Sequence, residues 1–232
     1  MVTQFFIKTK HKMLEISNIN VYDLKESVIA SGNAMRLEPV EYTDEEFQKG
    51  LKRMVRLVNA SKNGNVKCHD NALTGIRVSF DVKYPQYWTP EFQRYHFADI
   101  VTSSSKMHRL TKMDFRKACN KYVTDETIKN MEALVFEYNS IANEENDSDW
   151  EFNAEKRETH NDRLYIAFMR LLSNCPLGLE LFMRVSTNYK QLQTIYYQRK
   201  NHKLREDWSS FCKFIEGLPY FKELILGETN NE

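Results

Sequence analysis

The stretch STNYKQLQTIYYQRKNHKLREDW, residues Ser186 to Trp208, decides how the C-terminal half of this chain is expected to fold. Its spacing predicts one helix, because five residues recur on the same side at i, i+3, i+4, i+7 and i+11. These residues are Asn188, Gln191, Leu192, Ile195 and Arg199. Ser186 or Thr187 is expected to cap the start of the helix, and the basic residues near its end suit the negative pole of the helix dipole.

Three of the five residues in this stripe are polar. Burying a polar side chain without a partner costs about 1–3 kcal/mol. The stripe therefore predicts one of two arrangements: either it is partly solvated, or acceptor atoms lie against it. The sequence leaves both open.

Length and composition are those of an ordinary globular protein. The 232 residues suffice for one sizeable domain, and 41% of them are hydrophobic and 12% aromatic. The 33 basic and 32 acidic residues nearly cancel, so no overall field attracts nucleic acid or a membrane. No signal-peptide core and no run of about 18 apolar residues occurs, so we expect a cytoplasmic protein.

Apolar alternation and helical periodicity predict the order of the elements. Strands are predicted within 13–30 and at 76–82, and helices at 43–60, 91–101, 124–141, 161–172 and 206–216. The helix at 43–60 begins with a capping box, because Thr43 can cap forward while Glu46 reaches back.

Strands followed by a mostly helical second half predict an α+β fold, in which helices cover one mixed or antiparallel sheet. We expect a single domain over 1–232. It would hold N-terminal strands and a helix in 13–60, a sheet and the loop after it in 66–110, and a helical part in 124–216.

Basic and hydroxyl side chains gather after the strand predicted at 76–82. They are Arg94, His96, Ser103, Ser104, Ser105, His108 and Arg109. The basic pair at the start is placed to meet a pyrophosphate, or else is an ordinary surface pair. The three serines offer hydroxyl and backbone N–H donors to a phosphate, or else form a simple loop or N-cap. The last two residues are open to both interpretations.

Metal binding is not expected. The four cysteines, Cys68, Cys119, Cys175 and Cys212, are dispersed and form no CxxC pair, which is typical of reduced, buried thiols. The histidines show no i, i+4 pairing that would put two imidazoles on one helix face.

Three spacings resemble those of the flavin-dependent thymidylate synthases, including phage-encoded relatives. Arg199 follows Asn188 by eleven positions, as an arginine follows the family's N-x-R-S. Pro176 precedes Asn188 by twelve positions, as the proline of the family's Leu-Pro does. The segment from Arg94 to Arg109 follows a strand, as the signature R-H-R-x-x-S-x-N-E-x-S-x-R does. The resemblance covers about residues 66–216.

The chain also departs from the family pattern. R-H-R is replaced by Arg94-Tyr95-His96, and serines stand where the N-E pair is expected. The arginine of N-x-R-S is Lys190, which lacks the planar fork that grips a phosphate with two hydrogen bonds.

The resemblance implies a thymidylate-synthase-complementing-protein-like fold and a homotetramer with active sites between subunits. The implied reaction is the reductive methylation of a pyrimidine deoxynucleotide such as dUMP, with FAD as cofactor and methylene-folate and NADPH as co-substrates. The alternative is a degenerate family member that lost the reaction. Such a phage protein would bind a nucleotide or a host protein and act as a regulatory or counter-defence factor. Either protein would act in the cytoplasm, that of the host if a phage encodes it.

The resemblance also implies roles for single residues, while it assigns no catalytic residue. Contacts to the cofactor are expected from Arg94, His96, Ser103, Ser104, Ser105, Asn188 and Lys190. Contacts to the nucleotide are expected from Arg199, His202, His108 and Arg109. Structural alternatives remain: Asn188 as a residue that satisfies the helix N-terminus, Lys190 as a solvated lysine, and Arg199 as a partner of the helix dipole or of Glu206.

Overall fold

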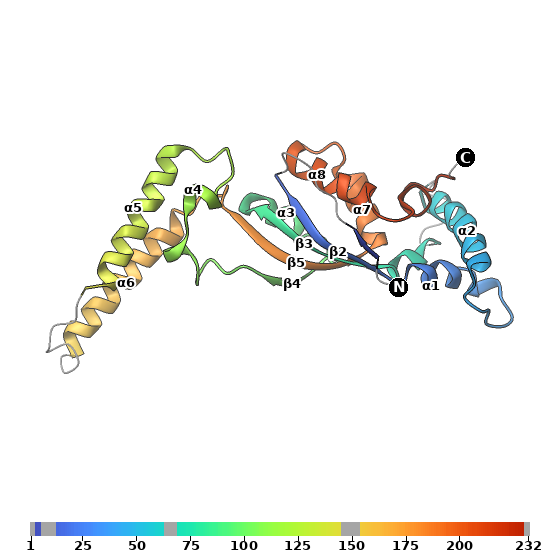
Figure 1. Cartoon of the computed structure of the whole chain (residues 1–232), viewed down its shortest axis with the longest axis horizontal. Helices are drawn as coiled ribbons and strands as arrows, with labels where there is room; N and C mark the ends of the chain where they lie inside the picture. The colour runs from blue at the N-terminus through green and yellow to red at the C-terminus, as the bar shows by residue number, and fades with distance from the viewer. Residues whose placement is uncertain (1–2, 6–12, 63–68, 145–153, 230–232) are drawn as a thin grey trace. The chain divides into compact units, whose positions relative to one another are not determined.

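The computed structural model of the chain describes residues 3–5, 13–62, 69–144 and 154–229 (Figure 1). These residues form two compact units. The sheet unit contains Met1–Tyr84, Pro90–Thr102 and Phe182–Glu232, and the hairpin unit contains Pro85–Thr89 and Ser103–Leu181. The single domain over 1–232 stays a prediction, and residues 66–68, including Cys68, lie outside the described residues.

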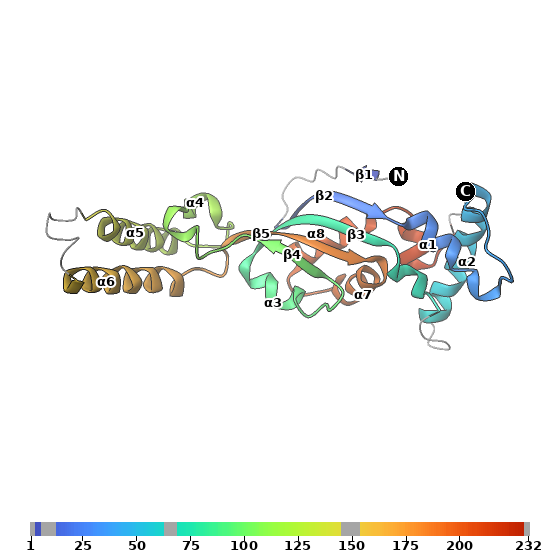
Figure 2. The ribbon, with the colours of Figure 1, turned by 90° about the horizontal axis from the view of Figure 1, so that it is seen from below.

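One five-stranded sheet organises the fold, in the order β1-β2-β3-β5-β4 (Figure 2). Its strands are β1 (Thr3–Phe5), β2 (Glu15–Tyr22), β3 (Arg77–Pro85), β4 (Asp99–Ser103) and β5 (Glu180–Asn188). β2 pairs antiparallel with both β1 and β3, and Val21 lies opposite Val78. The predicted α+β fold with one sheet covered by helices is confirmed.

The alternation at 76–82 sets the two faces of β3. Val78, Phe80 and Val82 are fully buried, while the residues between them are half-buried and polar. Helices α7 (Tyr189–Arg199) and α8 (Arg205–Glu216) cover the apolar face (Figure 1). The ring of Phe80 lies 4.7 Å from that of Phe214 on α8, between ring centroids. The apolar face therefore forms the core of the sheet unit.

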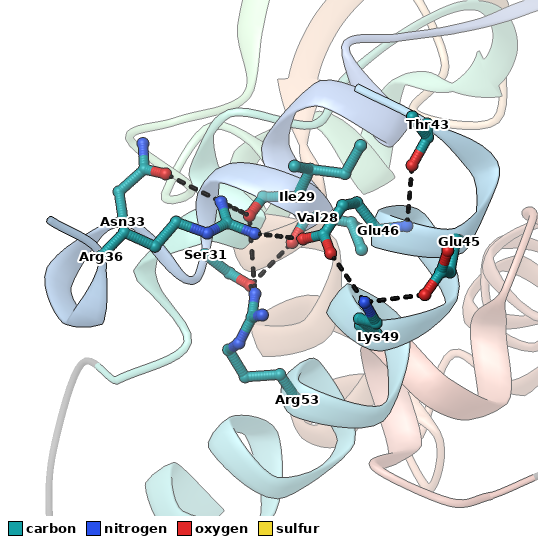
Figure 3. A network of polar contacts seen from close by, with 10 residues as sticks. All are labelled: Val28, Ile29, Ser31, Asn33, Arg36, Thr43, Glu45, Glu46, Lys49 and Arg53. Atoms are coloured by element: carbon teal, nitrogen blue, oxygen red, sulfur yellow. Dashed lines mark hydrogen bonds and ion pairs between the residues drawn. The ribbon is translucent and has the colours of Figure 1, made fainter. Parts of the chain in front are cut away.

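Helices α1 (Leu24–Ala30) and α2 (Asp44–Lys62) pack against each other at one end of the sheet unit. Arg36 Nη1 donates to the carbonyl oxygen of Ile29 at 3.0 Å, so it satisfies one of the orphan acceptors at the end of α1 (Figure 3). Arg53 Nη1 donates to Ser31 Oγ at 3.1 Å. Two arginines therefore secure the turn that follows α1.

The capping box of α2 is confirmed in its forward half. The backbone N–H of Glu46 donates to Thr43 Oγ1 at 3.2 Å. The Glu46 carboxylate does not reach back, because it pairs with Arg36 Nη2 at 2.7 Å and with Lys49 Nζ at 3.1 Å. The hydrogen bond from Lys49 is the main reason that the pKa of Glu46 lies below its usual value.

The hairpin unit is built around two long helices, α5 (Asp125–Ala142) and α6 (Ala154–Ser173), which lie side by side (Figures 1 and 2). Thr124 caps α5 by accepting the N–H of Thr127 at 3.3 Å. Both helices confirm the predictions for 124–141 and 161–172. The short elements of the chain are α3 (Thr89–Phe92), α4 (Phe115–Ala118), η1 (Asn33–Met35), η2 (Asn71–Thr74), η3 (Gln86–Trp88), η4 (Leu110–Lys112) and η5 (Lys222–Leu226).

The prediction of one helix over Ser186–Trp208 is wrong. Its first residues finish β5, α7 ends at Arg199, and a turn over 200–204 leads into α8. Asn188 is the N-cap of α7, since its Oδ1 accepts the N–H of Gln191 at 2.9 Å while its backbone stays extended. Thr187 does not cap the helix, because its hydroxyl donates to the Phe97 carbonyl at 2.8 Å.

Two further segments differ from prediction. The strand pattern within 13–30 ends at Tyr22, and the rest forms α1. The helix predicted at 91–101 is limited to the single turn of α3, after which the chain turns and joins the sheet as β4. In both cases packing against the sheet unit overrides a short local pattern.

Replacement of Gly50 by Ala is expected to destabilise the packing of α1 on α2. A Cβ at this position would lie 2.7 Å from the carbonyl oxygen of Val28. Overpacking costs about 1–3 kcal/mol, which exceeds the gain of at most about 1 kcal/mol from the helix propensity of alanine. The measurement is the free energy of unfolding in urea. Lys52→Ala, at an exposed position of α2, is the control and should unfold like the wild type.

Asn188→Ala should lower the free energy of unfolding by about 0.5–2 kcal/mol, because the N–H of Gln191 loses its acceptor. Asn188→Asp keeps a capping oxygen and should lose much less. Thermal and urea unfolding of the three proteins measure this difference. Equal stability of the alanine and aspartate variants would contradict the capping role.

Candidate functional site

A pocket of about 400 Å³ lies in the sheet unit where α7 gives way to α8. Its lining side chains are all polar: Arg199, Lys200, Asn201, His202, Arg205 and Ser209. Three of them carry a positive charge at neutral pH, and none is acidic. The volume falls within the range of small-ligand sites, about 300–1,000 Å³. The lining therefore suits a small anionic molecule.

The turn over 200–204 brings these side chains together. The N–H of His202 donates to the Arg199 carbonyl at 3.1 Å, which folds the chain back at the end of α7. His202 Nδ1 then accepts the N–H of Leu204 at 3.2 Å. Because Nδ1 is an acceptor here, the neutral imidazole carries its proton on Nε2.

Arg199 is held in place by its neighbours and is 13% exposed. Its Nε donates to the Tyr95 hydroxyl at 2.6 Å, and its Nη1 donates to Glu91 Oε2 at 3.0 Å. The guanidinium also lies over the Trp208 ring, 4.6 Å from its centroid. The orientation of Arg199 at the pocket is therefore fixed from inside the protein.

The Tyr95 hydroxyl connects Arg199 to Gln198, the residue before it on α7. It accepts from Arg199 and donates to Gln198 Oε1 at 3.1 Å. Burial raises the pKa of Tyr95, and the hydrogen bond from Arg199 only partly opposes this shift. The hydroxyl thus keeps its proton near neutral pH and can serve as donor and acceptor at once.

Of the residues predicted to bind the nucleotide, Arg199 and His202 both line the pocket. Asn188 does not. It lies at the opposite end of α7, about 16 Å away for a helix of this length, and it is 4% exposed. Its side-chain oxygen is engaged in capping, so the structure separates the two residues whose spacing carried the resemblance.

Lys190 is also engaged inside the protein. Its Nζ lies 2.5 Å from Oδ2 of the fully buried Asp70 and 3.1 Å from Gln193 Oε1. The buried stripe of α7 is satisfied in the same way, because Gln191 Oε1 accepts the N–H of Phe97 at 3.3 Å. The sequence left two arrangements of the stripe open. The structure shows the second one, because acceptor and donor atoms of the protein itself lie against the stripe.

The remaining predicted site residues lie in both units. Arg94 and His96 are exposed on the loop between α3 and β4, in the sheet unit. Ser103, Ser104, Ser105, His108 and Arg109 belong to the hairpin unit, where all but the half-buried Ser104 are exposed. Their roles stay predictions.

Sequence reasoning missed four lining residues, Lys200, Asn201, Arg205 and Ser209, and the three that hold Arg199, namely Glu91, Tyr95 and Trp208. A continuous helix would spread the basic run after Arg199 around its circumference, so these residues did not look like one site. The available signal was the run KNHKLR itself, in which the Asn favours a turn between two helices.

Other chemistry is sparse in the part of the chain that the structure describes. No three His, Cys, Asp or Glu side chains there come together as a metal site would require. Burial is the main cause that raises the pKa of the Cys212 thiol to about 11, which disfavours the reactive thiolate. None of the described helices is both long enough and apolar enough to cross a membrane.

The chain matches no protein-family model and no curated protein. Solved structures are similar to it. The flavin-dependent thymidylate synthase ThyX from Helicobacter pylori, complexed with FAD and dUMP, aligns with a TM-score of 0.54 and 16% identity, over 88% of this chain and 94% of that one. A second ThyX structure from Helicobacter pylori with FAD and dUMP gives 0.60 and 14%, over 91% and 96%. At such identity the likeness is one of fold: this chain folds like ThyX.

Proposed function

We propose that this chain is a nucleotide-binding, flavin-dependent enzyme of the thymidylate synthase type, which acts on a pyrimidine deoxynucleotide such as dUMP. The observation that carries the proposal is the cationic pocket at Arg199, in a chain that folds like proteins crystallised with FAD and dUMP. Neither feature alone would select this function.

The pocket supports binding of the nucleotide phosphate. A phosphomonoester carries about −1.5 to −2 charges at pH 7. Arg199, Lys200 and Arg205 supply three positive charges, and Asn201 and Ser209 supply neutral hydrogen-bonding groups. Arginine forks match phosphate oxygens with paired hydrogen bonds, which gives direction as well as charge. His202 lines the same wall.

The residues fit FAD only in part. Arg94 and His96 are exposed and suit its anionic pyrophosphate, and we propose that they contact it. For Ser103, Ser104 and Ser105 of the hairpin unit we propose separate contacts to a phosphate. Asn188 and Lys190 do not fit, because capping and the pair with Asp70 engage them. When bound, the flavin supplies hydride transfer. Methylene-folate and NADPH would be the co-substrates of the reductive methylation.

We further propose that the enzyme is a homo-oligomer, a tetramer as the resemblance implies. Large apolar side chains on α5 and α6 support subunit contacts, since Phe136 is 75% exposed, Tyr165 64% and Ile166 51%. The proposed location is the cytoplasm, which is the cytoplasm of the host if a phage encodes the chain.

A second candidate function keeps the fold and the pocket without the reaction, as a nucleotide-binding or host-protein-binding regulatory factor. The engagement of Asn188 and Lys190 inside the protein favours it, because two residues at family positions then have structural roles. Nucleotide binding would be common to both candidates, and methyl transfer would separate them.

The purified chain should bind FAD, seen as a flavin absorbance band after loading, and dUMP should raise its melting temperature. The physical reason is linkage, because a ligand that binds only the folded state stabilises it by about 2.7 kcal/mol at one hundred times its Kd. Expression should also rescue a thymidine-requiring bacterial strain.

The outcomes separate the candidates. Binding of dUMP without rescue would select the regulatory factor. A colourless protein whose melting temperature responds to neither ligand would refute nucleotide binding altogether. Uridine, which lacks the phosphate, is the matched ligand control and should give little or no shift.

Arg205→Ala should weaken dUMP binding about tenfold or more, because a hydrogen bond to a charged group contributes about 1.5–3 kcal/mol. Lys203→Ala is the matched control: Lys203 is exposed in the same turn but does not line the pocket. Isothermal titration of both variants measures the difference. Equal losses would mean that general positive charge, and not the pocket, attracts the ligand.

A further inference from the structure

One carboxylate oxygen organises the wall of the cationic pocket. Glu91 Oε2 accepts from Arg199 Nη1 at 3.0 Å and from Trp208 Nε1 at 2.8 Å. His202 Nε2 lies 3.5 Å from the same oxygen. Glu91 itself does not line the pocket, and its side chain is 26% exposed. Glu91 therefore contacts residues that line the pocket without lining it itself.

Glu91 helps to fix the orientation of the Arg199 guanidinium. The hydrogen bonds from Nε to Tyr95 and from Nη1 to Glu91 hold the guanidinium at two different nitrogens. The guanidinium also lies over the Trp208 ring, and the same Glu91 oxygen accepts from the Trp208 indole N–H. Nη2 makes no hydrogen bond to the described residues, and so it is available to an anion.

Glu91 also restrains His202. The imidazole accepts the N–H of Leu204 at Nδ1, so Nε2 carries the proton and faces Glu91 Oε2. Because Nδ1 acts as an acceptor and Nε2 as a donor, both the ring orientation and the tautomer of His202 are fixed. Two of the six lining residues are thus held by a single carboxylate.

We propose that Glu91 is the positioning residue of this pocket, and that it orients Arg199 and His202 for an anionic ligand. The proposal rests on the proposed function only for the identity of the ligand, a nucleotide monophosphate. It predicts a change in anion affinity that is opposite to the change expected from simple electrostatics. A carboxylate with no positioning role would only repel the anion, so its removal would tighten binding; a positioning carboxylate must weaken binding when it is lost.

Glu91→Gln should therefore weaken dUMP binding by about tenfold, because Arg199 loses a charged hydrogen-bond partner that holds its orientation. Glu91→Asp keeps the charge but shortens the reach by one methylene, and it too should bind more weakly. Asp81→Asn is the matched control, because it breaks an ion pair of 3.1 Å between Arg184 on β5 and Asp81 on β3. Both residues alternate with the buried core residues of their strands. This control should leave dUMP affinity unchanged. Unchanged or tighter binding by both Glu91 variants would overturn the proposal.

A second measurement needs no ligand. Phenylglyoxal labels accessible arginines, and peptide mass spectrometry reports the rate at each site. Arg199 should react several-fold faster in Glu91→Gln than in the wild type, with Arg184 as the internal reference. An unchanged rate in a variant with wild-type melting behaviour would overturn the positioning role. Should Glu91→Gln fail to fold, Glu91→Asp provides the same comparison.

The two measurements also separate this proposal from the function on which it rests. If the wild type does not bind dUMP, the proposed function fails, while the labelling rate of Arg199 still decides the role of Glu91. If the wild type binds dUMP and the labelling rate does not change, the function stands and the positioning role falls.

Discussion

At Asn188 strand β5 passes into helix α7 without a connecting loop, because one side chain closes the helix where the strand ends. Its Oδ1 satisfies the N–H of Gln191, and the backbone N–H of Tyr189 donates to the Ile76 carbonyl at 3.0 Å. The start of α7 is thereby joined to the chain just before β3. This junction fixes where α7 lies on the sheet, and with it the position of Arg199 eleven residues later.

The buried side of α7 carries polar as well as apolar residues, and its polar side chains find partners in the protein. Lys190 pairs with the buried Asp70, Gln191 accepts from the Phe97 backbone, and Arg199 donates to Glu91. Breaking such a buried charged pair from one side costs about 3–5 kcal/mol. The same contacts divide the helix functionally, since its first turn is occupied by internal partners while its last turn borders the pocket.

The pocket depends on the turn between α7 and α8. In a single long helix, successive basic residues would point in different directions, about 100° apart. The turn over 200–204 instead brings Lys200, His202 and Arg205 beside Arg199. Positive charges gathered in this way repel one another, and Glu91 offsets that repulsion from behind. Cationic side chains that line an open pocket and are paired with Glu91 on their inner side are suited to reversible binding of an anion.

The sequence by itself determined the α+β class, the buried strand at 76–82, and helices α2, α5, α6 and α8. Local periodicity encodes these features, because a strand or a long helix repeats its apolar side over many residues. Only the tertiary structure decided that Asn188 is a cap, that Lys190 pairs with Asp70, and that Glu91 holds Arg199. These contacts join residues about 100 positions apart or compete with a local pattern of similar strength, and no spacing along the chain reports them.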